Sequence, residues 1–397
     1  MTQSLDALFS PLSIRGLDLR NRFVMPAMQR GFMHDGAPTQ QMVDYLRRCA
    51  AGGVGLVICE STSPDHPSAY WQPVMGRMDA GTLHAWQKVV DAVHAEGAAI
   101  FIQLWHPGSM RKVAPDHPLA QLPAWSPSGL IQDGRGNGSA MTHANLAELQ
   151  ASYVRAARDA ARLGADGVEL HAAHGYLMDQ FLWSETNRRT DEFGGLTLAQ
   201  RARYPAAVAA AMRDAIGPEL VLSFRFSQFK EVDYGAAVAR DPYDLRDMIT
   251  LMRGAGVDMF NVSSRRFRKP EWPGAHPDWS IAQWTRSFTD AAVMTTGSVG
   301  LNVEMFADLF DGQDPSELSV SSDLQELAAR VADGTLDLVG VGRMHIANND
   351  FVDKVRAGRL HELALFNKHK HLAALAAAIE EGEPGFVEQG RKNAAVD

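Results

Sequence analysis

The chain has 397 residues, 46% of them hydrophobic, and is therefore long enough to enclose a large buried core. Its formal net charge of −9 argues against a nucleic-acid-binding surface and against a polybasic surface that binds membranes. Neither of the two cysteines, Cys49 and Cys59, belongs to a C-x-x-C pair, which excludes an iron–sulfur cluster or a cysteine-based zinc site. The first residues lack a signal-peptide pattern and no apolar run reaches membrane-spanning length, so we expect a cytoplasmic protein.

Short apolar runs recur along the chain, each of a length suited to a buried strand. They are FVMPAM (23–28), GLVICEST (55–62), AAIFIQLW (98–105), DGVELHAA (166–173), LVLSFRFS (220–227), MFNVSS (259–264), VMTTGSV (293–299) and LVGVGRM (338–344). Between them, apolar residues recur at three- and four-residue steps, which predicts helices over 41–53, 83–97, 146–164 and 198–217. Eight such units predict a closed (β/α)8 barrel. An open doubly wound sheet is the alternative, but no G-x-G-x-x-G follows the first strand.

Segments outside the repeating βα pattern also carry information. LSIRGLDLR (12–20) alternates around Arg15-Gly16, which predicts a short hairpin that plugs the bottom of the barrel. Residues 106–145, after the third strand, form an insertion too long for a simple connection, so we expect a lid, a binding loop or a disordered segment. The barrel is predicted to occupy residues 1–360, with a C-terminal helix and a polar tail over 361–397.

A barrel enzyme has its chemistry at the C-terminal ends of the strands. Strands seven and eight end in GSVG (297–300) and GVGR (340–343). Glycines let backbone N–H groups approach an anion closely, and Arg343 adds a permanent positive charge, so these segments predict a phosphate site. The alternative is that the glycines merely permit tight turns. Arg225, inside a buried strand, must either pair with a carboxylate or face the site and await an anion.

The stretch HAAHGY (171–176) ends the fourth strand and contains two histidines and a tyrosine. A metal site is one interpretation. However, the chain has no H-E-x-x-H motif, and the nearby Asp179 and Glu185 do not match a zinc spacing, so we predict no metal. Either histidine alone is readily explained as a core residue, but two at one strand end favour a functional site.

These residues occur in longer motifs that resemble the Old Yellow Enzyme family of FMN-dependent ene-reductases and NADH:flavin oxidoreductases. The resemblance covers about residues 6–360 and is most specific in the segment around HAAHGY. The motifs are LFSPLSIRGLDLRNRFVMPAM, IQLWHPG, VELHAAHGYLMDQFLWSETNRRTDEFGG, GSVG and VGVGRMHIANND. The resemblance implies non-covalently bound FMN across the barrel mouth, with NADH or NADPH as reductant.

The resemblance also implies a role for each matching residue. The FMN phosphate would be held by Ser298, Val299, Gly300, Gly342 and Arg343. The flavin ring would be contacted by Gln103, Arg225 and the backbone of Pro26, Ala27 and Met28. His171 and His174 would hydrogen-bond the carbonyl or nitro oxygen of a substrate stacked over the flavin, and Tyr176 would deliver a proton. Gln29, Trp105 and Phe267 would line the substrate site.

The implied activity is reduction of the activated C=C bond in an α,β-unsaturated carbonyl or nitro compound, a small-molecule substrate. The alternatives are a flavin-dependent dehydrogenase or demethylase that oxidises a small metabolite, and a non-enzymatic protein that binds flavin or another phosphate ligand. Gln29 stands where family members commonly carry Thr or Cys, or Met28 does if the register shifts by one, which leaves the direction of electron flow open. Dimers are common in the family, so a homodimer is expected.

A second insertion, RRFRKPEWPGAHPDW (265–279), follows strand six and contains Phe267, Trp272 and Trp279. Its first two residues, Arg265 and Arg266, have two interpretations. They attract an anionic substrate, or they form a solvated pair of loop charges.

Overall fold

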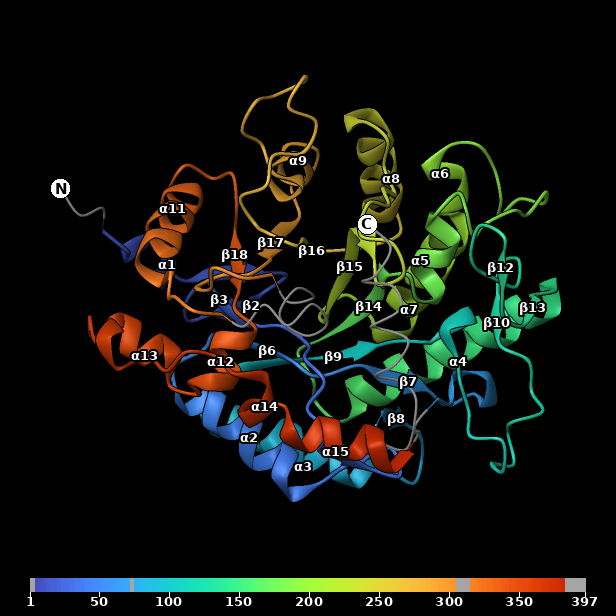
Figure 1. Ribbon diagram of the computed structural model, residues 1–397, viewed down its shortest axis with the longest axis horizontal. Helices are drawn as coiled ribbons and strands as arrows, with labels where there is room; N and C mark the ends of the chain where they lie inside the picture. Colours follow the sequence, from blue (N-terminus) through green and yellow to red (C-terminus); the bar gives the residue numbers. More distant parts are fainter. Residues whose placement is uncertain (1–3, 72–74, 305–314, 383–397) are drawn as a thin grey trace.

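The computed structural model describes residues 4–71, 75–304 and 315–382. Within them, eight parallel strands close a barrel, because each pairs with the next along the chain and the last pairs with the first. Each strand begins in one of the predicted apolar runs, so the (β/α)8 fold is confirmed, and Figure 1 shows the strands surrounded by helices. The strands are β3 (Phe23–Met25), β6 (Leu56–Ile58), β9 (Ala99–Leu104), β14 (Gly167–His174), β15 (Val221–Lys230), β16 (Met259–Ser263), β17 (Ala292–Thr296) and β18 (Leu338–Gly340).

Helices cover the outside of the barrel between successive strands. They include α2 (Gln40–Ala51), α3 (Leu83–His94), α4 (His143–Arg162), α7 (Arg203–Ile216), α8 (Pro242–Gly254), α9 (Ile281–Ser287), α11 (Val320–Ala332) and α12 (Arg343–Ala347). The single helix expected over 198–217 is divided at Ala202, where the short α6 (Leu198–Arg201) meets α7. Pro205 has no N–H to donate to the carbonyl of Arg201, so one uninterrupted hydrogen-bond ladder cannot form there.

The N-terminal hairpin consists of β1 (Leu12–Ile14) and β2 (Leu17–Leu19), preceded by α1 (Asp6–Phe9). Its turn residues Arg15 and Gly16 have φ values of 50° and 82°, the left-handed pair that a tight two-residue hairpin turn requires. The last residue of each hairpin strand, Ile14 in β1 and Leu19 in β2, is buried in the apolar cluster that fills the lower barrel. The predicted plug is therefore present.

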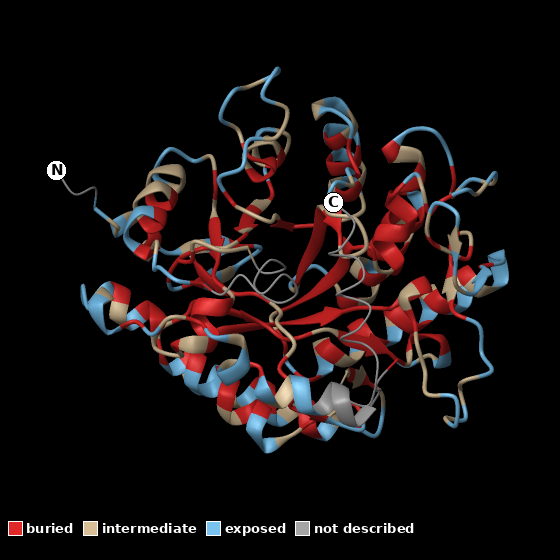
Figure 2. Ribbon diagram, viewed as in Figure 1, coloured by how far each residue is buried: buried red, intermediate tan, exposed pale blue. Residues whose placement is uncertain are grey.

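The barrel interior has two halves of different chemistry, which we call the lower and the upper half. Side chains alternate between the two faces of each strand, so every second residue points inward. The strands are buried along their length (Figure 2). Inward residues of the lower half are apolar: Val24, Leu56, Ile58, Ala99, Phe101, Val221, Met259, Met294 and Leu338. Those of the upper half, toward the C-terminal strand ends, are polar: Glu60, Gln103, Glu169, His171, Ser223, Arg225, Asn261 and Thr296.

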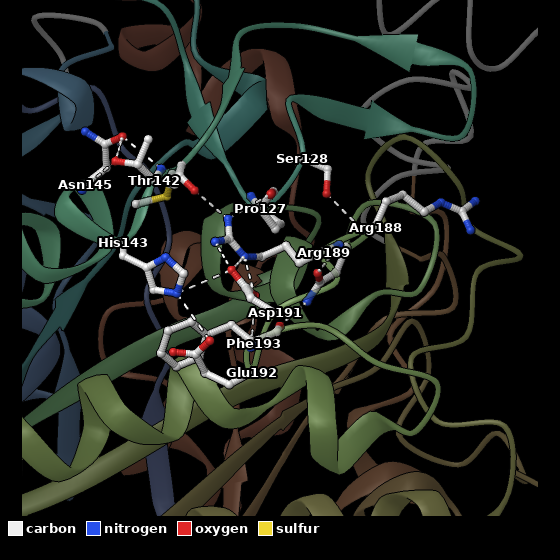
Figure 3. A network of polar contacts seen from close by, with 12 residues as sticks. Pro127, Ser128, Thr142, His143, Asn145, Arg188, Arg189, Asp191, Glu192 and Phe193 are labelled. Carbon is white, nitrogen blue, oxygen red and sulfur yellow. Dashed lines mark hydrogen bonds and ion pairs between the residues drawn. The ribbon is translucent and has the colours of Figure 1, made fainter.

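The long insertion after β9 is folded and does not fit the alternative of a disordered loop. It contains η2 (Gly108–Met110), β10 (Trp125–Ser126), β11 (Leu130–Gln132), β12 (Arg135–Gly136) and β13 (Ser139–Ala140). Figure 3 shows how Arg189 holds it: the guanidinium donates to the carbonyl oxygens of Pro127 and Met141 and pairs with Asp191. The insertion is thereby fixed to the segment that follows α5 (Leu177–Leu182), which itself follows HAAHGY.

Smaller elements complete the fold. They are β4 (Met33–His34) with β5 (Ala37–Pro38), β7 (Thr62–Pro64) with β8 (Gly76–Met78), α13 (Phe351–Arg356), α14 (Lys368–His371) and α15 (Ala373–Gly382). The last helices return to the barrel, where Arg30 Nη2 donates to the His371 carbonyl oxygen at 2.6 Å. The predicted polar tail from residue 383 onward lies outside the described residues. In the described ranges, no helix combines the length and the apolar composition needed to cross a bilayer.

Candidate active site

The two histidines of HAAHGY lie side by side at the end of β14, with ring centroids 5.4 Å apart. Residues three apart on a regular strand point to opposite faces. Here the pairing of β14 with β15 becomes irregular between Ala172 and His174, and His174 has a φ of 67°. This distortion turns the His174 ring toward the same side as His171.

Both imidazoles are buried, and both are neutral near pH 7. Burial lowers the pKa of His171 and of His174 well below the usual value, and the positive charge of Arg225 lowers both further. His174 Nε2 lies 2.9 Å from Ser263 Oγ. His171 Nδ1 has no hydrogen-bond partner among the described residues. A neutral imidazole still carries one N–H, so each ring can donate one hydrogen bond.

Arg225 faces the site and forms no ion pair with any residue that the structure describes. It lies opposite His171 in the register of β14 and β15 and is 5% exposed. Its Nη2 donates to Ser263 Oγ at 3.4 Å, while Nε and Nη1 have no partner in the part of the chain that the structure describes. Burial lowers the pKa of Arg225, and the carboxylate of Glu169 offsets part of that effect. A guanidinium keeps its charge under such a shift, so the upper half holds a cation with free donors.

Tyr176 follows the histidines and precedes α5. Its hydroxyl donates to Glu231 Oε2 at 3.0 Å. The phenol ring packs edge-on against Trp105, with centroids 5.1 Å apart, and Trp105 stacks on Trp71 at 5.5 Å. The predicted residues Tyr176, Trp105 and His171 therefore meet in one cluster. Sequence reasoning missed Trp71 and Glu231, which come from other loops and share no local pattern with HAAHGY.

A chain of hydrogen bonds crosses the upper half below the histidines. Ser61 Oγ donates to Gln103 Oε1 at 2.8 Å, and Gln103 Nε2 donates to Glu169 Oε1 at 2.7 Å. The other oxygen of Glu169 accepts bonds from Ser223 and Asn261. The amide of Gln103 is therefore fixed in one orientation, with one N–H and one lone pair of its oxygen still available. Glu169 was missed, although it lies two residues before His171 and so on the same face of the strand.

Two further polar side chains lie near the end of β3. Both amide atoms of Gln29 are buried and have no partner within the described ranges. Glu60 accepts the backbone N–H of Arg30 at 2.8 Å, whereas its Oε1 has no partner there. Burial raises the pKa of Glu60 to about 8, although hydrogen bonding and the charge of Arg30 oppose the shift.

The two glycine-rich segments meet at Ser298 and Arg343. Arg343 Nη2 donates to Ser298 Oγ at 3.1 Å, and Ser298 has a left-handed φ of 52°. A Cβ on Gly342 would lie 3.3 Å from Met28 Sδ, so this segment adjoins the end of β3. Gly300 has a φ of 83°, which fits the alternative that the glycines permit tight turns. Gly340 is also required by packing, since a Cβ there would lie 2.3 Å from Thr296 Oγ1. The Gly300 N–H is already donated to Asp323 at 2.7 Å.

The second insertion does not bring its predicted residues to the site. Phe267 is 2% exposed, belongs to the core cluster outside the strands, and carries the guanidinium groups of Arg268 and Arg330 on its ring. Arg265 and Arg266 both pair with Glu304. Two arginines already paired with a carboxylate fit the interpretation as loop charges better than attraction of an anionic substrate.

One group of side chains has the spacing of metal ligands, and it is not HAAHGY. Ligand atoms of His143, Asp191 and Glu192 come close together among the described residues (Figure 3). The carboxylate of Asp191 already binds Arg189 and the backbone N–H of Phe193. The group is explained by its role in fixing the loop after α5.

A parallel barrel whose upper half presents a buried cation, two neutral imidazoles and a phenol has the features of a flavin-dependent oxidoreductase. The family comparison agrees, because the model of the NADH:flavin oxidoreductase / NADH oxidase family matches residues 7–301. The chain belongs to this family, whose cofactor is FMN, and the resemblance to Old Yellow Enzymes is confirmed.

Individual relatives support the same assignment. A probable flavin mononucleotide-dependent alkene reductase of Leishmania infantum is 30% identical, over 90% of this chain and 92% of the relative. An NADH oxidase of Thermoanaerobacter brockii is also 30% identical, over 90% of this chain, but the chain spans only 52% of that protein. An N,N-dimethylglycine/sarcosine dehydrogenase of Chromohalobacter salexigens is 28% identical, over 88% of this chain and 48% of the relative. Morphinone reductase has a similar structure, with a TM-score of 0.73 and 26% identity over 94% of this chain and 93% of that one.

Proposed function

We propose that the protein reduces the activated C=C bond of an α,β-unsaturated carbonyl or nitro compound, with NADH or NADPH as electron donor. The observation that carries this proposal is the convergence of His171, His174 and Tyr176 at one strand end, beside the free donors of Arg225. Two donors and one acid are the groups that such a reduction needs around a single substrate oxygen and its α-carbon.

The described residues fit FMN. Nε and Nη1 of Arg225, and the remaining N–H and lone pair of Gln103, would bond the polar edge of the flavin ring. When bound, FMN would supply the chemistry of hydride transfer. The fixed guanidinium of Arg225 would stabilise the negative charge that the reduced flavin ring carries. Gln29 offers a further donor and acceptor to the ring or the substrate. The phosphate would be held by Ser298, Val299, Gly342 and Arg343, with Pro26, Ala27 and Met28 along the ring. Gly300 was expected to take part, but its N–H already bonds Asp323, so it would serve the turn.

The side chains above the flavin would then act on the substrate. Neutral His171 and His174 donate to its carbonyl or nitro oxygen, which withdraws electrons from the C=C bond and stabilises the negative charge that develops. Tyr176 gives its hydroxyl proton to the α-carbon. Trp105, which packs edge-on against Tyr176, limits the approach of water to the phenol.

An anaerobic experiment tests this proposal. NADH or NADPH is added to the flavin-loaded protein, and the absorbance of oxidised flavin is followed; cyclohexenone is then added. We expect bleaching with at least one nucleotide and recovery with the enone. If neither nucleotide bleaches the flavin, the reductase proposal is wrong.

Replacement of Tyr176 by Phe separates the two half-reactions. We expect α-carbon protonation to slow roughly 10²- to 10⁴-fold, because the proton donor is lost. Flavin reduction by the nicotinamide should keep its rate, since the phenol takes no part in it. Rapid mixing measures each step separately. Tyr243→Phe, at an exposed tyrosine, is the matched control and should leave both rates unchanged.

Oxidation of a small metabolite is the second candidate. Gln29 motivates it, because an amide in place of the usual Thr or Cys alters the hydrogen bonding near the flavin. Flavin bleaching by a secondary or tertiary amine such as dimethylglycine, without any nicotinamide, would favour this activity over the first.

A further inference from the structure

Glu231 is the one direct side-chain partner of the Tyr176 hydroxyl among the described residues, at 3.0 Å. It lies just after β15, which ends at Lys230, on a different element from Tyr176. Both side chains are half-buried. The carboxyl group that joins the phenol therefore belongs to a residue that is partly exposed to solvent.

The position of Glu231 is fixed by the same turn that positions Tyr176. Its backbone N–H donates to the His174 carbonyl oxygen at 3.1 Å. The preceding residue, Lys230, forms a fully buried ion pair with Asp179 at 2.8 Å, and Asp179 also accepts the Gly175 N–H at 2.6 Å. Together, these three contacts hold the end of β15 against the turn that carries Tyr176. They fix the short distance between the Tyr176 hydroxyl and the Glu231 carboxylate.

The Tyr176 phenol, buried beside a carboxylate, is a weak acid if no other group assists it. Burial and the adjacent carboxylate both raise the pKa of Tyr176 well above its usual value, so a phenolate left behind after proton donation is costly. Burial raises the pKa of Glu231 to about 7, with the Tyr176 hydrogen bond opposing. The charged group nearest to it in sequence, Lys230, is neutralised by Asp179, and His174 on the other side is uncharged. Glu231 therefore carries a proton in a sizeable fraction of molecules near neutral pH.

We propose that Glu231 is a proton-relay residue that acts through Tyr176, an inference that rests on the proposed reductase function. As the Tyr176 O–H bond breaks and its proton joins the substrate α-carbon, the carboxylic acid of Glu231 gives its own proton to the phenol oxygen. The electron pair of the new C–H bond comes from the substrate anion, and the negative charge ends on Glu231. The carboxylate then takes a proton from solvent, and no buried phenolate persists.

The test is Glu231→Gln in the flavin-loaded protein, which keeps a hydrogen-bond acceptor for Tyr176 but no transferable proton. Reduced protein is mixed with a nitroalkene, whose reduction yields a nitronate anion before protonation. Flavin absorbance then reports hydride transfer and nitronate absorbance reports protonation. We expect the variant to protonate roughly tenfold or more slowly with unchanged hydride transfer. Wild-type protonation should fall as the pH rises through about 7, and the variant should lose this dependence.

Glu219→Gln is the matched control, since Glu219 is exposed and precedes the opposite end of the same strand. It should keep both the wild-type rate and the wild-type pH profile. Wild-type protonation and pH profile in Glu231→Gln would overturn the relay while leaving the reductase function intact. Absence of flavin reoxidation by both an enone and a nitroalkene in the wild type would overturn the function and the relay together.

A second measurement does not depend on turnover. In protein labelled with carbon-13 at the tyrosine ring, the signal missing from Tyr176→Phe identifies Tyr176. In the wild type this signal should shift as Glu231 titrates near neutral pH, and the shift should vanish in Glu231→Gln. An identical titration in both proteins would show that the two groups are not coupled and would overturn the relay.

Discussion

The lower and upper halves of the barrel interior are built from the same strands, yet they satisfy opposite requirements. In the lower half, inward side chains such as Phe101 and Met259 pack with the hairpin plug and leave no polar atom to satisfy. In the upper half, Arg225, His171 and Glu60 hold buried polar atoms that have no partner among the described residues. Each such atom costs free energy in the unliganded protein.

This difference indicates that the lower half contributes to the stability of the barrel and that the upper half binds the ligand. The change from apolar to polar occurs within single strands: on β15, Val221 belongs to the lower cluster, whereas Arg225, four residues later on the same face, belongs to the upper half. The unpartnered polar atoms of the upper half are available to a ligand, so substitutions in the two halves should separate stability from flavin chemistry.

The largest expected effect is on stability and comes from the lower half. Phe101 is fully buried, and Gly167 on the neighbouring strand leaves room for its ring. Phe101→Ala should lower the free energy of unfolding by about 3–5 kcal/mol, because it removes apolar contacts and leaves a cavity. Urea unfolding of the apoprotein measures the loss, and Phe101→Leu should lose less. Flavin reduction per folded molecule should remain normal; a large change in it would mean that the halves are coupled.

Arg225→Met should produce the opposite pattern in the upper half. Methionine removes a buried cation with two unpartnered nitrogens, so the apoprotein should be as stable as the wild type or more so. Stabilisation of reduced flavin should weaken roughly 10²- to 10³-fold, the usual cost of losing one well-placed donor. Flavin midpoint potentials test this, with Arg225→Lys as the charge-preserving control. A destabilised apoprotein with an unchanged potential would show that Arg225 is structural.

The fold was predictable because periodicity and turn chemistry are local. Apolar runs alternating with helices predicted the barrel, and the left-handed pair Arg15-Gly16 marked the plug. Strand alternation would also have placed Glu169 beside His171. The partnership of Tyr176 with Glu231 was not predictable, because 55 residues separate them and a loop conformation brings them together.

Phe267 is a second residue whose position could not be predicted because it depends on a loop conformation. From the sequence, it was placed among the residues that would line the substrate site. The turn instead returns to β17, where the Phe267 N–H donates to the Gly297 carbonyl oxygen at 3.1 Å, and the ring enters the core. Loop direction depends on such long-range bonds, which composition does not encode.

The last expected effect is a pH dependence confined to the upper half. Because the pKa of Glu60 is raised to about 8 in the folded protein, folding retains a proton that the unfolded chain releases above its ordinary pKa. The contribution of Glu60 to stability is therefore full at low pH and is lost as pH rises toward 8, by at most about 1.4 kcal/mol per pH unit. Glu60→Gln lacks this loss, so its stability relative to wild type should increase between about pH 5 and pH 8.

Urea unfolding of the wild-type and Glu60→Gln apoproteins across that pH range gives the difference between their free energies of unfolding. The contributions of the other titrating groups cancel in this difference. Phe101→Leu, which removes no titratable group, should differ from wild type by the same amount at every pH. If Glu60→Gln also showed a constant difference, Glu60 would be ionised throughout and its Oε1 would have a partner. The contrast between the two halves would then rest on the unpartnered atoms of Arg225, His171 and Gln29, without support from Glu60.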